Sequence, residues 1–322
     1  MAQTTDYYPG FDILKYFLSI FIVAAHCELL NDSTEFIFNL CSLIESFAIP
    51  TFFAVSAYLF CDRINRPGIL KKTVTRTIIL FAIWYIIMFP MTYIRFYSIA
   101  SLKEIIYAIL LTCTLNGYWF FKALIFNTII LYFAYKGGAK RLRIVFIISL
   151  AIYLFFAYNY IYHYLEINIS PYYSFFYHTA YFFIGAFFYL YAKRTNNNII
   201  NRSITVCAII LLILLSINNS FHVLSRLIMP LLLMSFFRCI KSANSSFYKR
   251  LRALSILFYT MQFLFIWIYQ LSVDFYFNEP NLLSDMLRNS IIRFIIIISI
   301  LHIISATILA LERKYKVLHY LH

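Results

Sequence analysis

The chain has 322 residues, of which 63% are hydrophobic, 20% aromatic and only 12% charged. Soluble domains contain about 45–50% apolar and about 25% charged residues, so this composition excludes a water-soluble globule. It also excludes a disordered chain, which would be poor in apolar and aromatic residues. The formal net charge of +14 raises the question of a nucleic-acid partner.

Ten continuous apolar runs approach or reach the length of about 17–25 residues that a membrane-spanning helix needs. Because the runs do not alternate in polarity, they predict helices rather than the strands of a transmembrane barrel. A further stretch, Glu104–Thr114, is about half as long as a span, and we predict an interfacial or re-entrant helix there. The predicted spans are Phe11–Leu30, Ile37–Phe60, Val74–Tyr93, Tyr118–Tyr135, Ile144–Ile161, Tyr172–Ala192, Ile199–Ile217, Val223–Phe237, Ala253–Leu271 and Ile291–Leu311.

Lysine and arginine are concentrated in alternate loops, which predicts the orientation in the membrane. Basic segments follow the second, fourth, sixth, eighth and last predicted spans, whereas the other loops are acidic or neutral. Both termini are therefore predicted to be cytoplasmic, provided that Glu104–Thr114 does not cross. The positive charge is then chiefly a topology signal, and no nucleic-acid partner is needed to explain it. We predict an all-α polytopic bundle in the lipid bilayer, forming a single domain over residues 1–322.

The six cysteines carry no metal-binding pattern. They are scattered in or beside the predicted spans, without a C-x-x-C pair or the spacing of zinc ligands. Free cysteine packs as a small hydrophobic residue. We therefore interpret the cysteines as packing residues and expect no metal.

Polar residues on the first predicted span indicate a candidate site. Asp12, Lys15, Ser19 and His26 share one helix face, and the eleven residues from Lys15 to His26 correspond to about 16.5 Å of rise. Ionisable groups within spans are candidates for function. Histidine is the usual general base toward a hydroxyl, and Lys15 could hold an anionic donor, with Asp12 one turn away fixing its rotamer. The alternative is that Lys15 snorkels and His26 joins a hydrogen-bonded core.

The same helix carries a family resemblance. The segment "FDILKYFLSIFIVAAHCELL" resembles the opening helix of the acyltransferase-3 family of integral membrane acyltransferases, which begins with Asp-x-x-Arg and has a His eleven residues after the Arg. Asp12, Lys15 and His26 occupy these places. Five later segments are similar to the family in its order, so the resemblance covers most of the chain: "IPTFFAVSAYLF", "LKKTVTRTII", "GYWFFKALIFNTIILY", "YFFIGAFFYL" and "LSILFYTMQFLF".

The chain departs from the family pattern at several places, and Ala57 stands where the second-span segment of the family has Gly. Lys15 replaces the arginine, which keeps the charge but loses the planar fork that grips phosphate. In the basic pair before the third span Arg76 fits, whereas Thr73 takes the other place beside Lys72. Gln262 stands where the family has a late histidine.

The resemblance implies a bacterial inner-membrane O-acyltransferase, since many members O-acetylate bacterial surface glycans. An acyl-CoA, expected to be acetyl-CoA, would bind from the cytoplasm with its phosphates near Lys15, Lys72 and Arg76. His26 would deprotonate the acceptor hydroxyl, which then attacks the thioester. The acceptor would be a lipid-linked or polymeric glycan, and the enzyme could associate with polysaccharide synthesis machinery.

Other polar residues within or near the predicted spans are weaker candidates. Glu45 lies at a depth near His26 and could raise its basicity, or it could pair structurally with Lys122 or Arg226. Trp119 and Lys122 could contact a sugar, although Trp119 also suits an interfacial aromatic belt. His178 could line the site or make a hydrogen bond in the core.

Several basic residues near span ends have a simpler interpretation. We read Arg288 and Arg293 as residues whose long side chains reach the membrane surface. A different function, a polysaccharide exporter or flippase without acyl transfer, also fits polar-lined helices. An inverted repeat of broken helices would favour such a transporter, and we find no internal repeat. A scaffold without catalysis is disfavoured by the aligned Asp12, Lys15 and His26.

Overall fold

The structure is a computed structural model that describes residues 7–30, 35–92, 119–157, 177–195, 202–216, 222–240, 246–276, 282–312 and 314–322. Within these ranges the regular structure is helical throughout, without strands. The helices are α1 (Pro9–His26), α2 (Glu35–Cys61), α3 (Ile69–Thr92), α5 (Trp119–Lys136), α6 (Gly138–Ala157), α8 (Thr179–Thr195), α9 (Arg202–Ser216), α10 (His222–Arg238), α11 (Ser246–Tyr276), α12 (Leu282–Arg288), α13 (Ser290–Leu311) and the 3₁₀ helix η4 (Lys316–Leu321).

Each of the ten predicted spans overlaps one of these helices, so the all-α prediction is confirmed for the described residues. Five segments in the described ranges are long and apolar enough to cross a membrane: Pro9–His26, Cys41–Cys61, Ile69–Met91, Ser246–Tyr276 and Ser290–Leu311. The full set of ten crossings and the cytoplasmic termini stay predictions. Glu104–Thr114 lies outside the described residues.

Three helices begin more than one turn earlier than the apolar runs that predicted them. The structure begins α3 at Ile69 rather than Val74, α6 at Gly138 rather than Ile144, and α11 at Ser246 rather than Ala253. The added turns contain lysine and arginine, which are good helix formers but lower the local hydropathy. Hydropathy therefore indicates the part of a helix that can lie in lipid, and it underestimates the full length of the helix.

The chain divides into two compact units. Among the described residues, the first contains 50–92, 119–157, 177–195 and 226–231, and the second contains 7–30, 35–49, 202–216, 222–225, 232–240, 246–276, 282–312 and 314–322. The division passes through α2, because Ile49 belongs to the second unit and Pro50 to the first.

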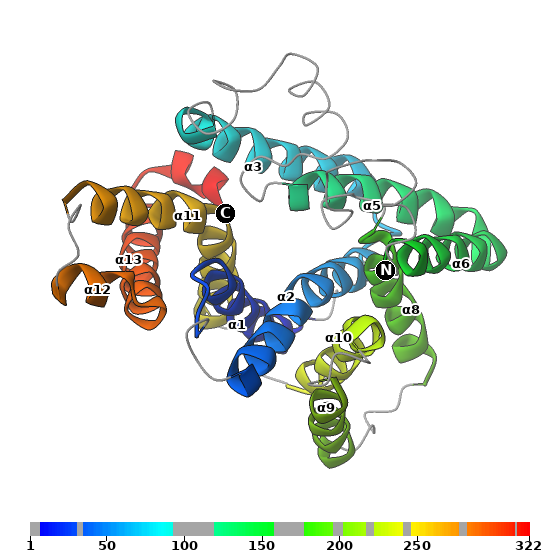
Figure 1. The fold of residues 1–322 in the computed structure, drawn as a ribbon. Helices are drawn as coiled ribbons and strands as arrows, with labels where there is room; N and C mark the ends of the chain where they lie inside the picture. The colour runs from blue at the N-terminus through cyan, green and yellow to red at the C-terminus, as the bar shows by residue number, and fades with distance from the viewer. Residues whose placement is uncertain are drawn as a thin grey trace. The chain divides into compact units, whose positions relative to one another are not determined.

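In the second unit, α1 packs along α11, and α13 contacts both of them. Figure 1 shows α11 leading through the short α12 into α13. The helices α1 and α11 run in the same direction, because residues near their starts contact each other (Asp12 and Arg252) and so do later ones (His26 and Phe263). This three-helix arrangement positions the first-span residues that the sequence singled out.

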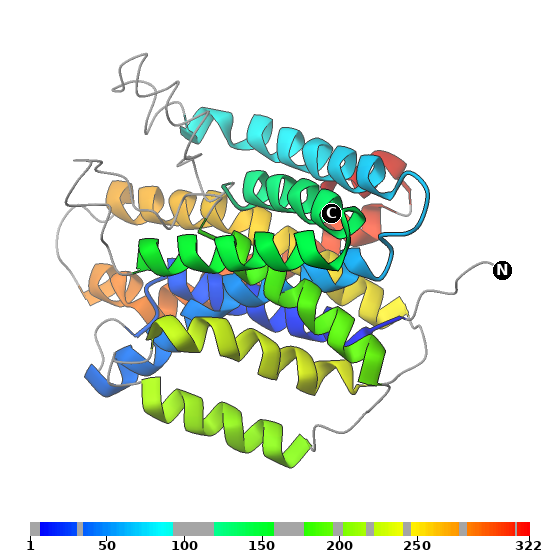
Figure 2. The ribbon, with the colours of Figure 1, turned by 90° about the vertical axis from the view of Figure 1, so that its right-hand side faces the viewer.

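In the first unit, α5 contacts α3, α6 and α8, and α6 also contacts α8. Figure 2 shows α3, α5 and α6 side by side with their axes nearly parallel. Gly185 of α8 meets the backbone of α2, since a Cβ atom built on it would lie 2.0 Å from the carbonyl oxygen of Ala54. Small residues at such crossings let membrane helices approach closely.

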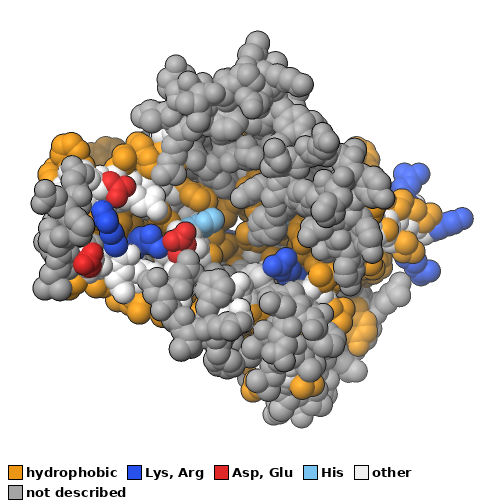
Figure 3. Space-filling model, viewed as in Figure 1, with side chains coloured by type: hydrophobic (Ala, Val, Ile, Leu, Met, Phe, Trp, Pro, Cys, Tyr) orange, Lys and Arg blue, Asp and Glu red, His pale blue; other side chains and the backbone are white. Residues whose placement is uncertain are grey.

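The outer side chains of several helices are apolar, as a lipid surrounding requires. Ile86, Phe275 and Ile303 are 70%, 74% and 67% exposed. In the described part of the face drawn in Figure 3, hydrophobic side chains cover more area than charged ones. Several hydroxyl groups in the helices donate to backbone within their own helix: Ser149 and Thr260, for example, donate to the carbonyl oxygens of Val145 and Ile256, four residues earlier.

Candidate active site

Asp12, in the first turn of α1, is held by an arginine of α11. Its carboxylate accepts a bidentate pair of hydrogen bonds from Arg252, with Nε to Oδ1 at 2.7 Å and Nη2 to Oδ2 at 2.8 Å. The Asp12 side chain is 2% exposed and that of Arg252 is 46% exposed. Hydrogen bonds between charged groups are roughly twice as strong as those between neutral groups, and two parallel bonds fix the orientation of both side chains.

Tyr7 completes the environment of Asp12. Its hydroxyl donates to Oδ2 of Asp12 at 3.0 Å. Burial and then the hydrogen bond to the carboxylate raise the pKa of Tyr7 to about 12, so the phenol keeps its proton at neutral pH. Both oxygens of Asp12 thus accept hydrogen bonds, from Arg252 and from Tyr7, and the orientation of Lys15 by Asp12 stays a prediction.

Lys15 and His26 lie on one unbroken helix, since α1 runs from Pro9 to His26. The step of eleven residues from Lys15 to His26 therefore corresponds to a rise of about 16.5 Å along the helix axis. Lys15 is half-buried. His26 is the last residue of α1, its side chain is exposed, and its ring contacts the ring of Phe263 on α11 with centroids 4.4 Å apart. An exposed imidazole at a helix end can accept a proton from a bound hydroxyl.

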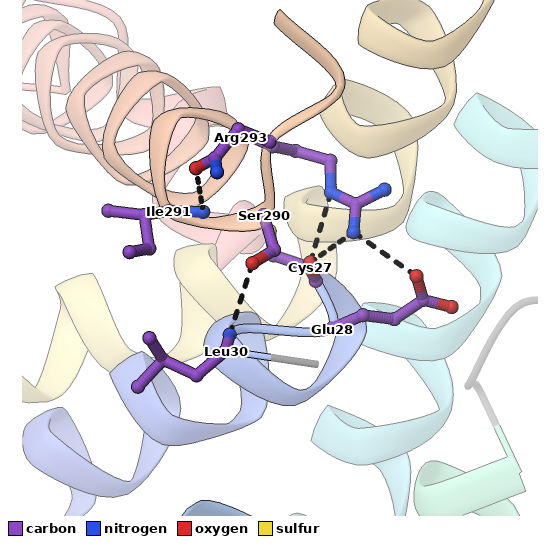
Figure 4. A network of polar contacts seen from close by, with 7 residues as sticks. Cys27, Glu28, Leu30, Ser290, Ile291 and Arg293 are labelled. Carbon is purple, nitrogen blue, oxygen red and sulfur yellow. Dashed lines mark hydrogen bonds and ion pairs between the residues drawn. The ribbon is translucent and has the colours of Figure 1, made fainter. Parts of the chain in front are cut away.

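The backbone just after His26 is bonded to the start of α13 (Figure 4). Arg293 donates to the carbonyl oxygen of Cys27 from Nε at 3.0 Å and also from Nη2. Nη2 also forms an ion pair with Glu28 at 3.2 Å. The backbone N–H of Leu30 donates to Oγ of Ser290 at 3.1 Å. These contacts differ from the interpretation of Arg293 as a residue reaching for the membrane surface, because its side chain is 14% exposed and bonds to protein groups.

Tyr16, which lies between Asp12 and His26 along α1, pairs with a histidine of α13. The hydroxyl of Tyr16 lies 2.5 Å from Nε2 of His302 on α13. Nδ1 of His302 lies 2.9 Å from the carbonyl oxygen of Ile298 and must donate to it, because a carbonyl only accepts. Nε2 of a neutral His302 is then the acceptor for the Tyr16 proton.

Sequence reasoning missed Arg252, Arg293 and the pair of Tyr16 with His302. Arg252 belongs to the basic segment after the eighth predicted span, and Arg293 lies near a span end. Their partners lie 240 and 266 residues away in the chain. A helical spacing reveals only neighbours on the same helix, so no local pattern pointed to these partners.

In the first unit, the side chains of Trp119 and His178, which are distant in the sequence, contact each other. The His178 ring stacks on Trp119, with centroids 4.4 Å apart, and on Phe53, at 5.1 Å. Trp119 is 4% exposed and His178 is fully buried. A sugar could stack on Trp119 only if these rings moved apart, so this geometry favours core packing. Lys122 is half-buried on the same helix, α5.

The remaining predicted residues are placed as follows. Lys72 and Arg76 are exposed and lie one turn apart on α3 in the first unit. Their assignment to the donor phosphates stays a prediction. Glu45 belongs to α2, but its side chain lies outside the described residues. Gln262 is fully buried on α11, and its amide oxygen and nitrogen have no hydrogen-bond partner among the described groups.

Comparison with known proteins identifies the family. A family model described as an acyltransferase domain, of the acyltransferase-3 type, matches residues 8–311, nearly the whole chain. The chain belongs to the acyltransferase-3 family. Neither the curated proteins nor the solved structures contained a match to it.

Family membership establishes the general class of this acyltransferase-3 protein. It is a membrane acyltransferase with several membrane-spanning helices. The matched range includes all of α1 and most of the described helices, so the Asp12, Lys15 and His26 face lies inside the acyltransferase domain. The described residues contain no group of three or more His, Cys, Asp or Glu side chains that could hold a metal ion.

Proposed function

We propose that this protein transfers an acyl group, expected to be acetyl, from a cytoplasmic acyl-CoA to a hydroxyl of a bacterial surface or lipid-linked glycan. His26 is the general base in this proposal, and Lys15 holds the phosphates of the donor. Asp12 keeps the start of α1 fixed through Arg252. The protein would act in the bacterial inner membrane, alongside polysaccharide synthesis machinery.

The observation that carries the proposal is that Lys15 and His26 lie on one helix, α1. Lys15 and His26 stand where the resemblance puts the family's Arg and His, and α1 is continuous between them. Their separation of about 16.5 Å suits an extended donor whose charged end and reactive thioester lie far apart. The exposed ring of His26 leaves space for an acceptor hydroxyl beside it.

The chemistry is a direct acyl transfer. A ring nitrogen of His26 takes the proton of the acceptor hydroxyl while the oxygen attacks the thioester carbonyl. The carbon–sulfur bond breaks, an ester forms on the glycan, and the CoA thiolate leaves. The imidazolium then returns the proton to the sulfur, so His26 is regenerated and CoA is released as the thiol.

The first test replaces the proposed base. In membranes supplied with radiolabelled acetyl-CoA and the host's glycan, His26→Ala should lower the transfer rate by at least about 100-fold, because general base catalysis typically contributes that much. The acceptor is recovered from the membranes and the label in it is counted.

His322→Ala is the matched control. His322 pairs with Glu312 near the chain end at 3.0 Å and has no part in the proposed chemistry. This variant should transfer label at the parental rate. The proposal would be contradicted if His26→Ala transferred label at the parental rate while present in the membrane at the parental level.

A further inference from the structure

The end of α1 has a defined capping structure. The N–H of Glu28 donates to the carbonyl oxygen of Ala25 at 3.0 Å, and the N–H of Leu29 donates to that of Ala24 at 3.1 Å. These two bonds are the pair that defines a Schellman motif, with Glu28 at the position where the backbone turns left-handed. The φ angle of Glu28 is 52°. His26 is the last helical residue before this turn.

The residue at the left-handed position is unusual. Glycine is the common choice there, because a Cβ atom crowds the following carbonyl oxygen. Here the position holds glutamate, and Leu30 two residues later also has a positive φ, of 64°. Such conformations persist only where the surrounding structure holds them, and they concentrate at functional sites.

Arg293 and Ser290, both on α13, hold this turn. Arg293 binds the carbonyl oxygen of Cys27 through two nitrogens and pairs with the Glu28 carboxylate, and Ser290 accepts from the N–H of Leu30 (Figure 4). A cation at the carboxyl end of a helix also interacts favourably with its dipole. The choice of glutamate over glycine is explained by its side chain, which binds Arg293.

We propose that Arg293 is a positioning residue for His26. The inference rests on the proposed function, in which His26 is the base. Arg293 fixes the peptide that directly follows His26, and it thereby fixes the direction in which the imidazole leaves the helix. Placement errors of about 1 Å at a reacting group can cost about 100-fold in rate. Arg293 does not touch the reactants itself.

The test separates the rate of the chemical step from donor binding. Arg293→Ala should lower kcat for acetyl transfer by about 10- to 100-fold, while the KM for acetyl-CoA stays within about twofold. Arg293→Lys retains the charge but not the fork, and it should recover part of the loss. Glu28→Gly removes the ion pair with Arg293, so kcat should fall. Because glycine adopts the left-handed conformation easily, the thermal midpoint of unfolding should not fall.

Arg288→Ala, an exposed arginine on α12, is the matched control and should leave kcat at the parental value. If Arg293→Ala fails to fold, Glu28→Gly and Arg293→Lys still decide the question through kcat. Parental kcat in the Arg293 and Glu28 variants, with His26→Ala inactive, would overturn the positioning role and leave the proposed function intact. Full transfer by His26→Ala would overturn both.

Discussion

Asp12 shows how a carboxylate is kept inside an apolar helix. It is 2% exposed, yet both of its oxygens are bonded, to Arg252 and to Tyr7. A buried charge is costly unless it is paired, and removing one partner of such a pair leaves the other charge uncompensated. The stability of α1 in its place should therefore depend on Arg252 more than on Asp12 itself.

Arg252→Ala should destabilise the protein by about 3 kcal/mol, the lower end of the range for breaking a buried pair, because Arg252 is partly exposed. The double variant Asp12→Asn with Arg252→Ala should recover part of this loss, since no buried charge then remains. Thermal unfolding of the detergent-solubilised protein measures both. Arg250→Ala, an exposed neighbour on α11, should change little. A double variant less stable than Arg252→Ala alone would contradict this account.

Residue-level prediction from the helical period is limited to the residues of one helix. The period predicted that Asp12, Lys15 and His26 share one face of the first helix. It could not assign Arg252 to Asp12 or Arg293 to Cys27, because those partners are set by the packing of α1 against α11 and α13. The sequence does not distinguish a basic residue near a span end whose side chain extends to water from one whose side chain binds a backbone carbonyl group.

At the level of elements, the crossing of α8 over α2 depends on the missing side chain of Gly185. The Cβ contact of 2.0 Å would be to backbone, the carbonyl oxygen of Ala54, which cannot turn aside as a flexible side chain can. Van der Waals packing between close backbones is a main source of helix association in lipid. Hydropathy predicted that these helices exist but carried no information about which ones touch.

Gly185→Ala should destabilise the first unit by about 1–3 kcal/mol, the usual cost of overpacking. The measurement is the thermal midpoint in detergent, together with the amount of protein inserted in the membrane. Gly137→Ala provides the comparison, because the nearest atoms there belong to the flexible side chain of Arg141 and can move away. Equal midpoints for the two variants would refute the close-approach explanation.

For the whole molecule, the net charge of +14 is expected to reflect orientation in the membrane. Basic side chains at the starts of α3, α6 and α11, such as Lys71, Lys140 and Lys249, are exposed. The alternation predicts that these three helix starts face the cytoplasm. The number of crossings decides whether this holds, since one added crossing at Glu104–Thr114 would place the start of α6 on the other side.

Reporter fusions test this arrangement. Alkaline phosphatase, which is active only outside the cytoplasm, should be active when fused after Glu28 and inactive when fused after Arg143. A fluorescent protein that folds only in the cytoplasm should give the opposite result at both sites. Active phosphatase after Arg143 would show that Glu104–Thr114 crosses the membrane and that the predicted orientation of the following helices is wrong.

The two ends of α1 are bonded to different helices, Arg252 of α11 at the start and Arg293 of α13 at the end. Sliding or rotating α1 against either neighbour would break charged hydrogen bonds at one end or the other. The three helices should therefore move as a single rigid body during turnover. Any opening that admits a donor or releases a product has to come from the displacement of other helices, with α1 as the stationary reference.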